Sequence, residues 1–422
     1  MDTGVTSQKV RWILPFVLLV TLTIAYLDRL NLAIALPKIT DEFGWTVAQT
    51  GEYGGLLISI FFVGYGLTNM LLSPLAEKIG PRKSLLTIIV LFSFFTAITA
   101  PLASFLTAFI AVRFLLGVGE GVHFPMMSLL TKNWFPVKER SRANGIWVSG
   151  VMFSTILAPL LLVPVIEWIG WRGMFIFLGV LGVGVSIPLV WLFVYNNPRT
   201  HPKISAEEIG YIESGMEKDE KVREGTFWQE IKPIARDKIY WIALMGGILN
   251  NFASYGLMMW FPLYFNKSRG VEFSSLKYAV SIPYMSAILG IICVALISDK
   301  LQRRALIAGI GYVITGILGY FACTASSITT TIALFSVAIF FQMSYTTNEF
   351  AILQRILPKN KVATGTGFYN GLAMLIGGGL GPVVVGQVIA YTKDYTSGIL
   401  TLVAFSLIAG FNMLVLSRFL KY

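Results

Sequence analysis

The first long apolar stretch of the chain reads WILPFVLLVTLTIAYLDRLNLAIAL, from Trp12 to Leu36. A helix of roughly 20 apolar residues spans the hydrocarbon core of a bilayer, so this stretch predicts a membrane-spanning helix. Asp28 and Arg29 lie well inside it. Ionisable side chains at that depth are costly and normally face a water-filled path for a solute or a proton. The stretch therefore predicts a membrane protein with a transport path.

Composition extends this interpretation to the whole chain. Of 422 residues, 55% are hydrophobic and only 13% are charged, and the mean hydropathy is +0.71. Soluble domains are about 45–50% apolar and about 25% charged. The apolar runs predict an all-α integral membrane protein with twelve spans, at 12–36, 51–73, 84–102, 104–131, 142–166, 172–195, 239–265, 274–297, 305–323, 328–353, 363–391 and 396–417.

The net charge of +11 reflects membrane orientation rather than nucleic-acid binding. With the N-terminus in the cytoplasm, 25 of the 33 lysines and arginines lie in cytoplasmic segments and 6 in external ones. This asymmetry is the positive-inside pattern, and it predicts that both termini are cytoplasmic. The only two cysteines lie in apolar spans, so no disulfide framework is expected.

The chain divides into two similar halves joined by a polar linker. Glu77 and Asp299 each follow the second span of a half and are 222 residues apart, while Gly145 and Gly365 precede the fifth spans and are 220 apart. We predict two pseudo-symmetric six-helix bundles, at 1–195 and 237–422, with a substrate site at the midplane between the repeats. The linker, 196–236, is cytoplasmic and contains a short amphipathic helix that begins at Ser205.

Several motifs indicate a family. The loop LAEKIGPRK at 75–83 resembles the signature of the major facilitator superfamily, although a glutamate replaces its usual aspartate. The stretches LDRLN (27–31), RFLLGVGEG (113–121), GWR (170–172), NP with HP (197–202), WFPLY (260–264) and GFYN (367–370) together resemble the anion:cation symporter family of that superfamily. Its members include bacterial sugar-acid transporters, sialin and the vesicular glutamate and phosphate transporters.

A second buried pair of charges, Arg113 and Glu120, lies in the fourth span. Their separation of seven residues is two helical turns, so both side chains point to one side, about 10 Å apart along the axis. Asp28 and Arg29 are consecutive and diverge by about 100°. We expect Asp28 to pair with Arg113 across helices, because the resemblance implies that spans 1 and 4 are close. Arg29 then remains to bind an anion and Glu120 to carry a proton.

The resemblance implies proton coupling at Asp28 and Glu120 and substrate contacts at Arg29 and Arg113. Arginine stays charged and offers a planar fork that fits a carboxylate or a phosphate. A carboxyl group in a partly dry site can bind a proton on one side of the membrane and release it on the other. The alternative is that the four residues form static ion pairs that hold the helices together.

Other polar residues on the spans are further candidates for substrate contact. By resemblance, Tyr65 and Asn370 occupy positions that meet the substrate in relatives. Trp260 and Tyr264 flank a proline on the seventh span, and Tyr264 is expected at an external gate. For each of these the alternative is ordinary packing.

Three residues have a weaker claim. His123 follows Glu120 by three residues and is a proton-relay candidate, with a packing role favoured. Glu349 is six residues from Arg355, where a gate ion pair is the favoured interpretation. Gln342 stands in the C-terminal half where the repeat would place a counterpart of Glu120, so proton chemistry is expected in the N-terminal half alone.

A cytoplasmic latch is expected from the charged residues of the loops between spans. It would stabilise the outward-open state and break for inward opening; the alternative is that these charges act only in membrane orientation. Its residues are Glu77, Arg82, Lys83, Arg140 and Arg142 in the first half and Asp299 and Arg303 in the second.

The sequence thus predicts a secondary active transporter that imports an organic anion, a sugar acid or another carboxylate, with protons by alternating access. The alternatives are an anion exchanger without proton coupling, proton-driven export, and a receptor that does not transport. No nucleotide-binding loop, metal-ligand set or catalytic constellation is found, so no enzyme, cofactor or metal is expected.

Departures from the family pattern bear on the substrate. Ser149-Gly150 is not followed by the glutamine of some sugar-acid relatives, and the seventh span has no arginine. A less hydroxylated carboxylate therefore remains a candidate. The resemblance implies a monomer in a prokaryotic plasma membrane, with no nucleic-acid partner.

Overall fold

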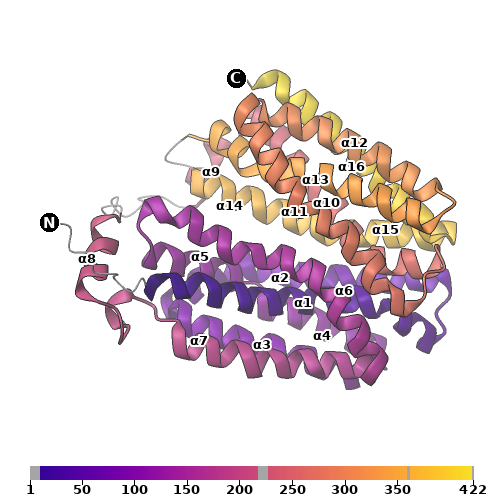
Figure 1. The fold of residues 1–422 in the computed structure, drawn as a ribbon, viewed down its shortest axis with the longest axis horizontal. Helices are drawn as coiled ribbons and strands as arrows, with labels where there is room; N and C mark the ends of the chain where they lie inside the picture. The colour runs from indigo at the N-terminus through magenta and orange to yellow at the C-terminus, as the bar shows by residue number, and fades with distance from the viewer. Residues whose placement is uncertain (1–9, 217–226, 359–361, 421–422) are drawn as a thin grey trace. The chain divides into compact units, whose positions relative to one another are not determined.

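The computed structural model describes residues 10–216, 227–358 and 362–420, and within them every regular element is a helix (Figure 1). By length and composition, eleven of the described helical stretches could each cross a membrane. The prediction of an all-α membrane protein is confirmed. The long helices form from uninterrupted apolar runs, because a helix pairs its backbone N–H and C=O groups within the segment, where lipid offers them no partner.

In the N-terminal half, the helices follow the predicted spans. The fourth span is divided at Gly121 and Val122 into α4 and α5. The bounds are α1 Ile13–Phe43, preceded by one 3₁₀ turn at Val10–Trp12, then α2 Val47–Ile79, α3 Pro81–Leu102, α4 Leu106–Glu120, α5 His123–Trp134, α6 Val137–Leu181, a π-helical segment Gly182–Ser186, and α7 Ile187–Phe193.

The predicted fifth and sixth spans form one continuous helical stretch, Val137–Phe193, of 57 residues. At 1.5 Å per residue it would be about 85 Å long if straight, nearly three times the thickness of the hydrocarbon core of a bilayer. Gly170 interrupts it with φ 74° and ψ 166°, a backbone conformation that glycine adopts without steric cost. The stretch therefore crosses twice, which accounts for the twelfth predicted span.

The C-terminal half repeats the pattern of long helices. Its eleventh span is divided by a glycine-rich π-helical segment at Ala373–Gly378. The bounds are α10 Lys238–Lys267, a 3₁₀ turn Phe273–Ser275, α11 Leu276–Leu301, α12 Arg304–Thr324, α13 Ile328–Ile356, α14 Val362–Leu372, α15 Gly379–Thr392 and α16 Tyr395–Phe419.

The linker contains two short helices, one more than the sequence predicts. Helix α8, Ala206–Ser214, begins where expected, and the Ser205 side chain accepts a hydrogen bond from the backbone N–H of Glu208. Helix α9 spans Phe227–Ile234, and a 3₁₀ turn at Pro198–Thr200 precedes α8.

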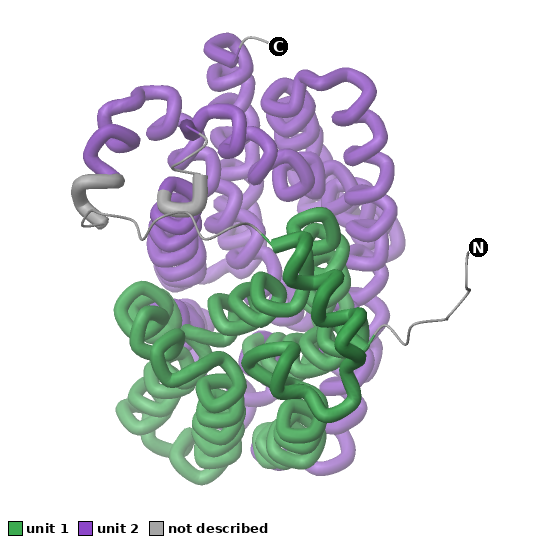
Figure 2. The backbone as a smooth tube through the Cα atoms, turned by 90° about the vertical axis from the view of Figure 1, so that its left-hand side faces the viewer, with its two compact units in different colours: residues 1–29, 64–154, 175–224 green, residues 30–63, 155–174, 225–422 purple. Residues whose placement is uncertain are grey.

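Contacts between residues group the chain into two compact units that cut across its sequence halves (Figure 2). Unit 1 comprises residues 1–29, 64–154 and 175–224, and within it α3 packs against α4, α5 and α7. Unit 2 comprises 30–63, 155–174 and 225–422, where α12 packs against α13 and α16, and α10 against α15 and α16. The outer parts of α1 and α2 therefore belong to the same unit as the C-terminal helices.

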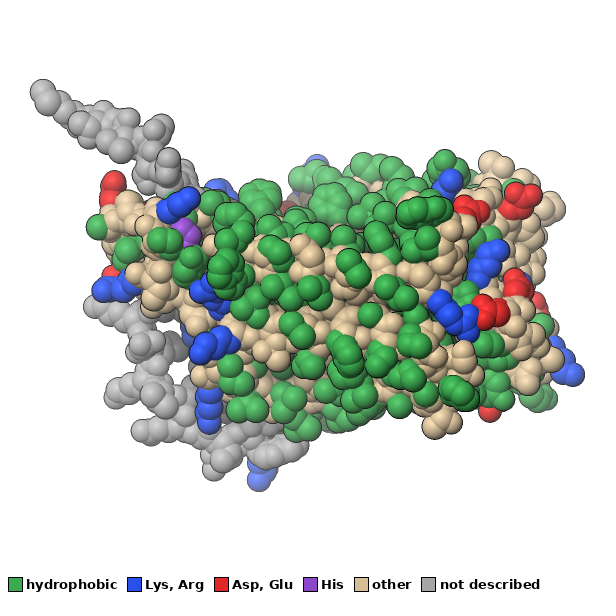
Figure 3. Space-filling view, turned by 90° about the horizontal axis from the view of Figure 1, so that it is seen from below, with side chains coloured by type: hydrophobic (Ala, Val, Ile, Leu, Met, Phe, Trp, Pro, Cys, Tyr) green, Lys and Arg blue, Asp and Glu red, His purple; other side chains and the backbone are tan. Residues whose placement is uncertain are grey.

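Large apolar side chains cover much of the surface, as lipid contact requires. Trp168, Leu71 and Leu296 are 83%, 69% and 68% exposed. On the face in Figure 3, hydrophobic side chains fill the middle and charged side chains lie toward the two ends. Lipid, rather than protein, is the environment that suits such a surface.

Candidate functional site

Arg29 and Glu120 form an ion pair deep in unit 1. The distance from Arg29 Nε to Glu120 Oε2 is 2.7 Å, and neither side chain is exposed to solvent. Arg29 comes from the middle of α1, whereas Glu120 is the last residue of α4. Glu120 Oε1 has no hydrogen-bond partner among the described residues. The glutamate therefore keeps one oxygen available for a proton.

Two aromatic rings hold the Arg29 guanidinium. Its central carbon lies 4.3 Å from the ring centroid of Tyr26 and 4.3 Å from that of Tyr65. A guanidinium over aromatic faces is attracted by the ring quadrupole, and the attraction is strongest where water is excluded. Tyr65, predicted as a substrate contact, is buried and packs on the cation that would bind an anion.

Glycines bring α2 close to α4 and so place Tyr65. A methyl group on Gly121 would lie 2.7 Å from the backbone oxygen of Tyr65, and one on Gly64 would collide with the backbone oxygen of Phe114. The two backbones can approach this closely only because these residues lack a Cβ.

Asp28 lies beside Arg29 on the chain but has other partners. Thr96 of α3 donates a hydrogen bond from its hydroxyl to Asp28 Oδ2. The Asp28 carboxylate lies in the electrostatic field of Glu120, Arg113 and Arg29. All four charged residues are buried in unit 1. The structure thus brings Asp28, Arg29, Arg113 and Glu120 together, as predicted.

The pairing within this group differs in part from the prediction. The sequence left Arg29 to the substrate and Glu120 to the proton, whereas here the two are paired with each other. Arg113 attracts both Asp28 and Glu120. This attraction agrees with the predicted pairing of Arg113 with Asp28. The Arg29 guanidinium thus has an acidic partner inside the protein.

His123, the first residue of α5, is fully buried near this group. Neither ring nitrogen has a hydrogen-bond partner among the described residues. The imidazole stacks on Phe92, with ring centroids 6.3 Å apart and an interplanar angle of 27°. This environment favours the predicted packing role.

The candidates in unit 2 have varied surroundings. The Trp260 indole N–H donates to the backbone oxygen of Pro382, 3.1 Å away. Tyr264 is buried among aromatic rings, with Phe335 at 6.0 Å between centroids. Asn370 of α14 is exposed. Trp260 and Tyr264 are thus buried with protein contacts, whereas Asn370 is exposed.

The interior of unit 2 contains a group of polar side chains that was not predicted from the sequence. Tyr369 donates to Glu349 Oε1 at 2.8 Å, and its hydroxyl lies 2.9 Å from that of Tyr345. The expected ion pair between Glu349 and Arg355 is absent among the described residues. The signal available in the sequence was the GFYN motif, which placed Tyr369 beside Asn370.

Two arginines of the predicted latch have backbone partners. Arg82 donates to the Trp191 oxygen and lies over the Tyr195 ring at 4.7 Å. Arg140 donates to the backbone oxygen of Phe135 at 3.1 Å. Among the described residues, Glu77 forms no ion pair with either arginine. Asp299 pairs with Arg304 at 2.9 Å.

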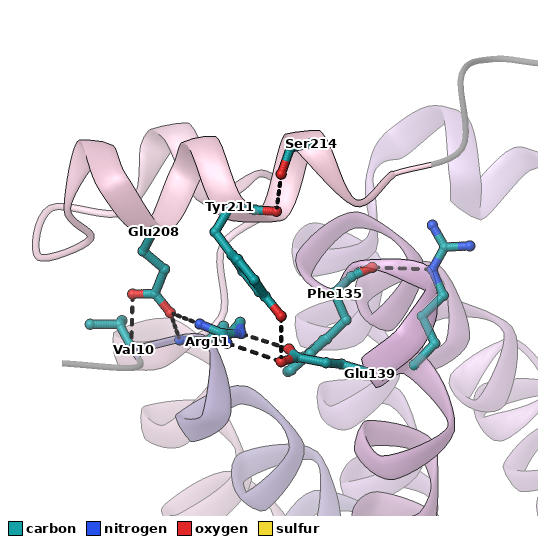
Figure 4. A network of polar contacts seen from close by, with 8 residues as sticks. Val10, Arg11, Phe135, Glu139, Glu208, Tyr211 and Ser214 are labelled. Carbon is teal, nitrogen blue, oxygen red and sulfur yellow. Dashed lines mark hydrogen bonds and ion pairs between the residues drawn. The ribbon is translucent and has the colours of Figure 1, made fainter. Parts of the chain in front are cut away.

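A buried network links the start of α1 to the linker (Figure 4). The Glu208 carboxylate accepts hydrogen bonds from the backbone N–H groups of Val10 and Arg11, at 3.1 and 3.2 Å, and from Arg11 Nη1 at 2.8 Å. Arg11 also pairs with Glu139 at 2.9 Å. Tyr211 donates to Glu139, a bond that raises the pKa of Tyr211. Helix α8 is thereby joined to α1 and α6.

The described residues contain no cluster of three or more histidine, cysteine or acidic side chains that could hold a metal ion.

Comparison with known proteins identifies the family. A family model described as "Major Facilitator Superfamily" matches residues 18–382. A probable sulfoacetate transporter of Cupriavidus necator is 28% identical over 67% of this chain and 63% of its own length. A probable galactarate/D-glucarate transporter of Escherichia coli strain K12 is 25% identical over 96% of this chain and 92% of its own.

A solved structure has the same fold. It is a bacterial homologue of the human lysosomal transporter Spinster in an inward-facing, unoccupied conformation, and it covers 98% of both chains with a TM-score of 0.82 at 19% identity. The long apolar helices, the buried charges and these matches agree, and the chain belongs to the Major Facilitator Superfamily.

Proposed function

We propose that this protein is a secondary active transporter that imports a small organic anion together with protons by alternating access. The observation that carries this proposal is the buried pair of Arg29 and Glu120. An anion-binding cation and a protonatable acid occupy the same dry site, so binding at one is linked to the charge of the other.

The pair suggests how coupling works. While Glu120 is ionised it occupies Arg29, and an incoming carboxylate has to displace it. A proton on Glu120, accepted at the unbonded Oε1, removes its charge and so weakens its attraction to Arg29. A buried cation whose ion pair is weakened gains more from an incoming anion. Proton binding and anion binding therefore favour each other, and this reciprocity is the basis of symport.

Asp28 and Arg113 complete the charge balance in this scheme. Thr96 donates to Asp28, and both arginines attract it. We propose that Asp28 is a second proton site and that Arg113 keeps the group close to neutral as protons and substrate exchange.

The substrate class follows from Arg29 and from the names of the relatives. Sulfoacetate and galactarate or glucarate, after which the two relatives are named, carry at least one carboxylate. The guanidinium fork fits such a group bidentately. We propose an organic carboxylate with Arg29, Tyr65 and Asn370 as contacts. Trp260 and Tyr264 remain further candidates for substrate contact in this proposal, with Tyr264 at an external gate.

The proposal includes the setting of the protein. We propose bundles at 1–195 and 237–422 joined by the linker 196–236, in a monomer in a prokaryotic inner membrane with both termini cytoplasmic. The lysine and arginine asymmetry supports this orientation. The predicted latch remains part of the proposal, with Asp299 paired to Arg304 in this structure.

The test is uptake into proteoliposomes of labelled D-glucarate, D-galactonate, sulfoacetate and phosphate, with and without an inward proton gradient. We expect gradient-driven accumulation of at least one carboxylate, abolished by a protonophore. Glu120→Gln should retain counterflow of that substrate and lose accumulation. Glu207→Gln is the matched control, because Glu207 is exposed on α8.

The alternatives predict other results. Anion exchange that does not depend on the proton gradient and is unchanged in Glu120→Gln would identify an exchanger and contradict the proton coupling. Binding of a carboxylate without any flux would identify a receptor.

A further inference from the structure

A carboxylate in the C-terminal half lies in a chain of hydroxyl groups. Glu349 and Tyr345 are four residues apart on α13, so they share one face of the helix. Tyr369 of α14 bridges them, with its hydroxyl 2.8 Å from Glu349 Oε1 and 2.9 Å from the Tyr345 hydroxyl. Both tyrosines are 2% exposed, while Glu349 is half-buried. Part of the Glu349 side chain is therefore accessible, whereas both tyrosine partners are buried.

Glu349 has no cationic partner among the described residues. Neutral hydroxyl donors stabilise an ionised carboxylate less than an arginine does. A carboxylate that only holds helices together inside a membrane protein is normally paired with a cation. The surroundings of Glu349 suit an acid that changes its protonation state.

The titratable groups that interact with Glu349 are tyrosine hydroxyls. Three tyrosines lie in the electrostatic field of Glu349: Tyr345 on its own helix, Tyr312 of α12 and Tyr369 of α14. From α10, Tyr240 donates to the backbone oxygen of Gly365 at 2.7 Å. Asp299 of α11 and Arg304 of α12 pair with each other.

The hydrogen bonds have a direction. Because Tyr369 donates to the Glu349 carboxylate, it accepts from Tyr345. A protonated Glu349 can instead donate to Tyr369, which then donates to Tyr345, and the Tyr345 hydroxyl is free to donate elsewhere. Protonation thus reverses the whole chain.

An acceptor for the reversed chain lies nearby. Asn412 Oδ1 of α16 is buried and has no hydrogen-bond partner among the described residues. A methyl group on Gly246 would lie 2.9 Å from the Tyr345 hydroxyl and 3.0 Å from Asn412 Oδ1, so both atoms border the same space beside α10. The reversed chain would offer this oxygen a donor.

We infer that Glu349 is a further proton-binding site, located in the C-terminal half, whose protonation reverses the hydroxyl chain through Tyr369 and Tyr345. The sequence predicted proton chemistry in the N-terminal half alone. Tyr369 is adjacent to the proposed substrate contact Asn370, so the site would link proton binding on α13 to substrate binding on α14. This consequence for transport rests on the proposed function, whereas proton binding itself does not.

Proton binding can be measured without any substrate. The full chain in lipid is titrated with acid while infrared difference spectra record the carbonyl stretch of protonated carboxyl groups. We expect Glu349→Gln to remove one such band from the wild-type spectrum. Tyr369→Phe should keep the band but shift its frequency, because the carboxyl group loses its hydrogen-bond partner. Glu207→Gln, on the exposed face of α8, is the control.

Either of two results would overturn the inference. One is a Glu349→Gln spectrum with every wild-type carboxyl band across the titration. The other is a Tyr369→Phe spectrum with no shifted band, and this variant keeps the test decisive where Glu349→Gln does not fold.

The number of protons moved per substrate separates this inference from the proposed function. We expect Glu349→Gln to move one proton fewer per substrate than the wild type. Wild-type protein that transports without protons but shows the Glu349 band would contradict the proposed function and support the Glu349 site. A proton-coupled wild type, with unchanged stoichiometry and spectra in Glu349→Gln, would contradict the Glu349 site alone.

Discussion

Arg29 Nε lies 2.7 Å from Glu120 Oε2, and neither side chain is exposed. The cation expected to bind substrate is thus already bound to the acid expected to carry the proton. Competition at a single guanidinium is enough to link the two ligands.

Arg29→Lys tests whether the planar fork is needed. Lysine keeps the charge but cannot bind a carboxylate bidentately, and it stacks less well between Tyr26 and Tyr65. We expect the KM for the transported carboxylate to rise about tenfold, equivalent to ~1.4 kcal/mol, with normal amounts of protein in the membrane. Initial uptake rates measure this, with Arg199→Lys in the exposed linker as control. An unchanged KM would remove Arg29 from the binding site.

A single and a double variant test how the charges of Arg29 and Glu120 contribute to stability. Arg29→Met leaves Glu120 buried without its cation, and we expect a loss of about 3–5 kcal/mol in the free energy of unfolding. Arg29→Met with Glu120→Leu should recover most of that loss, because no charge is left unpaired. Unfolding in detergent followed by tryptophan fluorescence measures both. A double variant as unstable as the single one would show that packing, not charge, dominates at this site.

Glu208→Ala tests the attachment of the linker. The change removes acceptors for two buried backbone N–H groups and for Arg11. We expect a loss of about 1–3 kcal/mol in the free energy of unfolding, and faster hydrogen exchange in α8 and the first turn of α1. Glu207→Ala, one residue away and exposed, should change neither. Equal exchange in both variants would show that α8 docks by other contacts.

Gly386→Val tests a close contact in unit 2. Gly51 of α2 and Gly386 of α15 approach so closely that a Cβ on either would collide with the backbone oxygen of the other. A valine must separate these helices, and we expect slower transport with more open external ends. The measurement is external labelling of a cysteine placed at Thr46, in a background without Cys293 and Cys323. Labelling equal to that of the glycine parent would show that the contact does not close the outside.

The helices and the buried charges could be predicted from the sequence because both depend on local properties. An apolar run predicts a membrane span, and a charged residue inside that run indicates a buried functional site. The pairing of those charges could not be predicted. The angle between Asp28 and Arg29 is fixed by helix geometry, but the partner that each meets depends on how closely the neighbouring helices approach. Here Gly64 and Gly121 set that approach for Tyr65.

Long-range partners were the other limit. Ser205 and Glu208 could be recognised as a helix start because they are three residues apart. The bond from Glu208 to Arg11 joins residues 197 apart, and no periodicity reports it. The same holds for Glu349. Its predicted partner was Arg355, six residues away, whereas its partner in the structure is Tyr369 on another helix.

The Glu208 contact also has a consequence for the order of synthesis. The backbone N–H groups at the start of α1 acquire their carboxylate only after Glu208 has been translated, which is later than all six spans of the first half. Until then the first helix enters the membrane with its leading turn uncapped. Translation of the linker therefore completes the first half before the second half emerges, and the earliest segment of the protein is among the last of that half to be fixed in place.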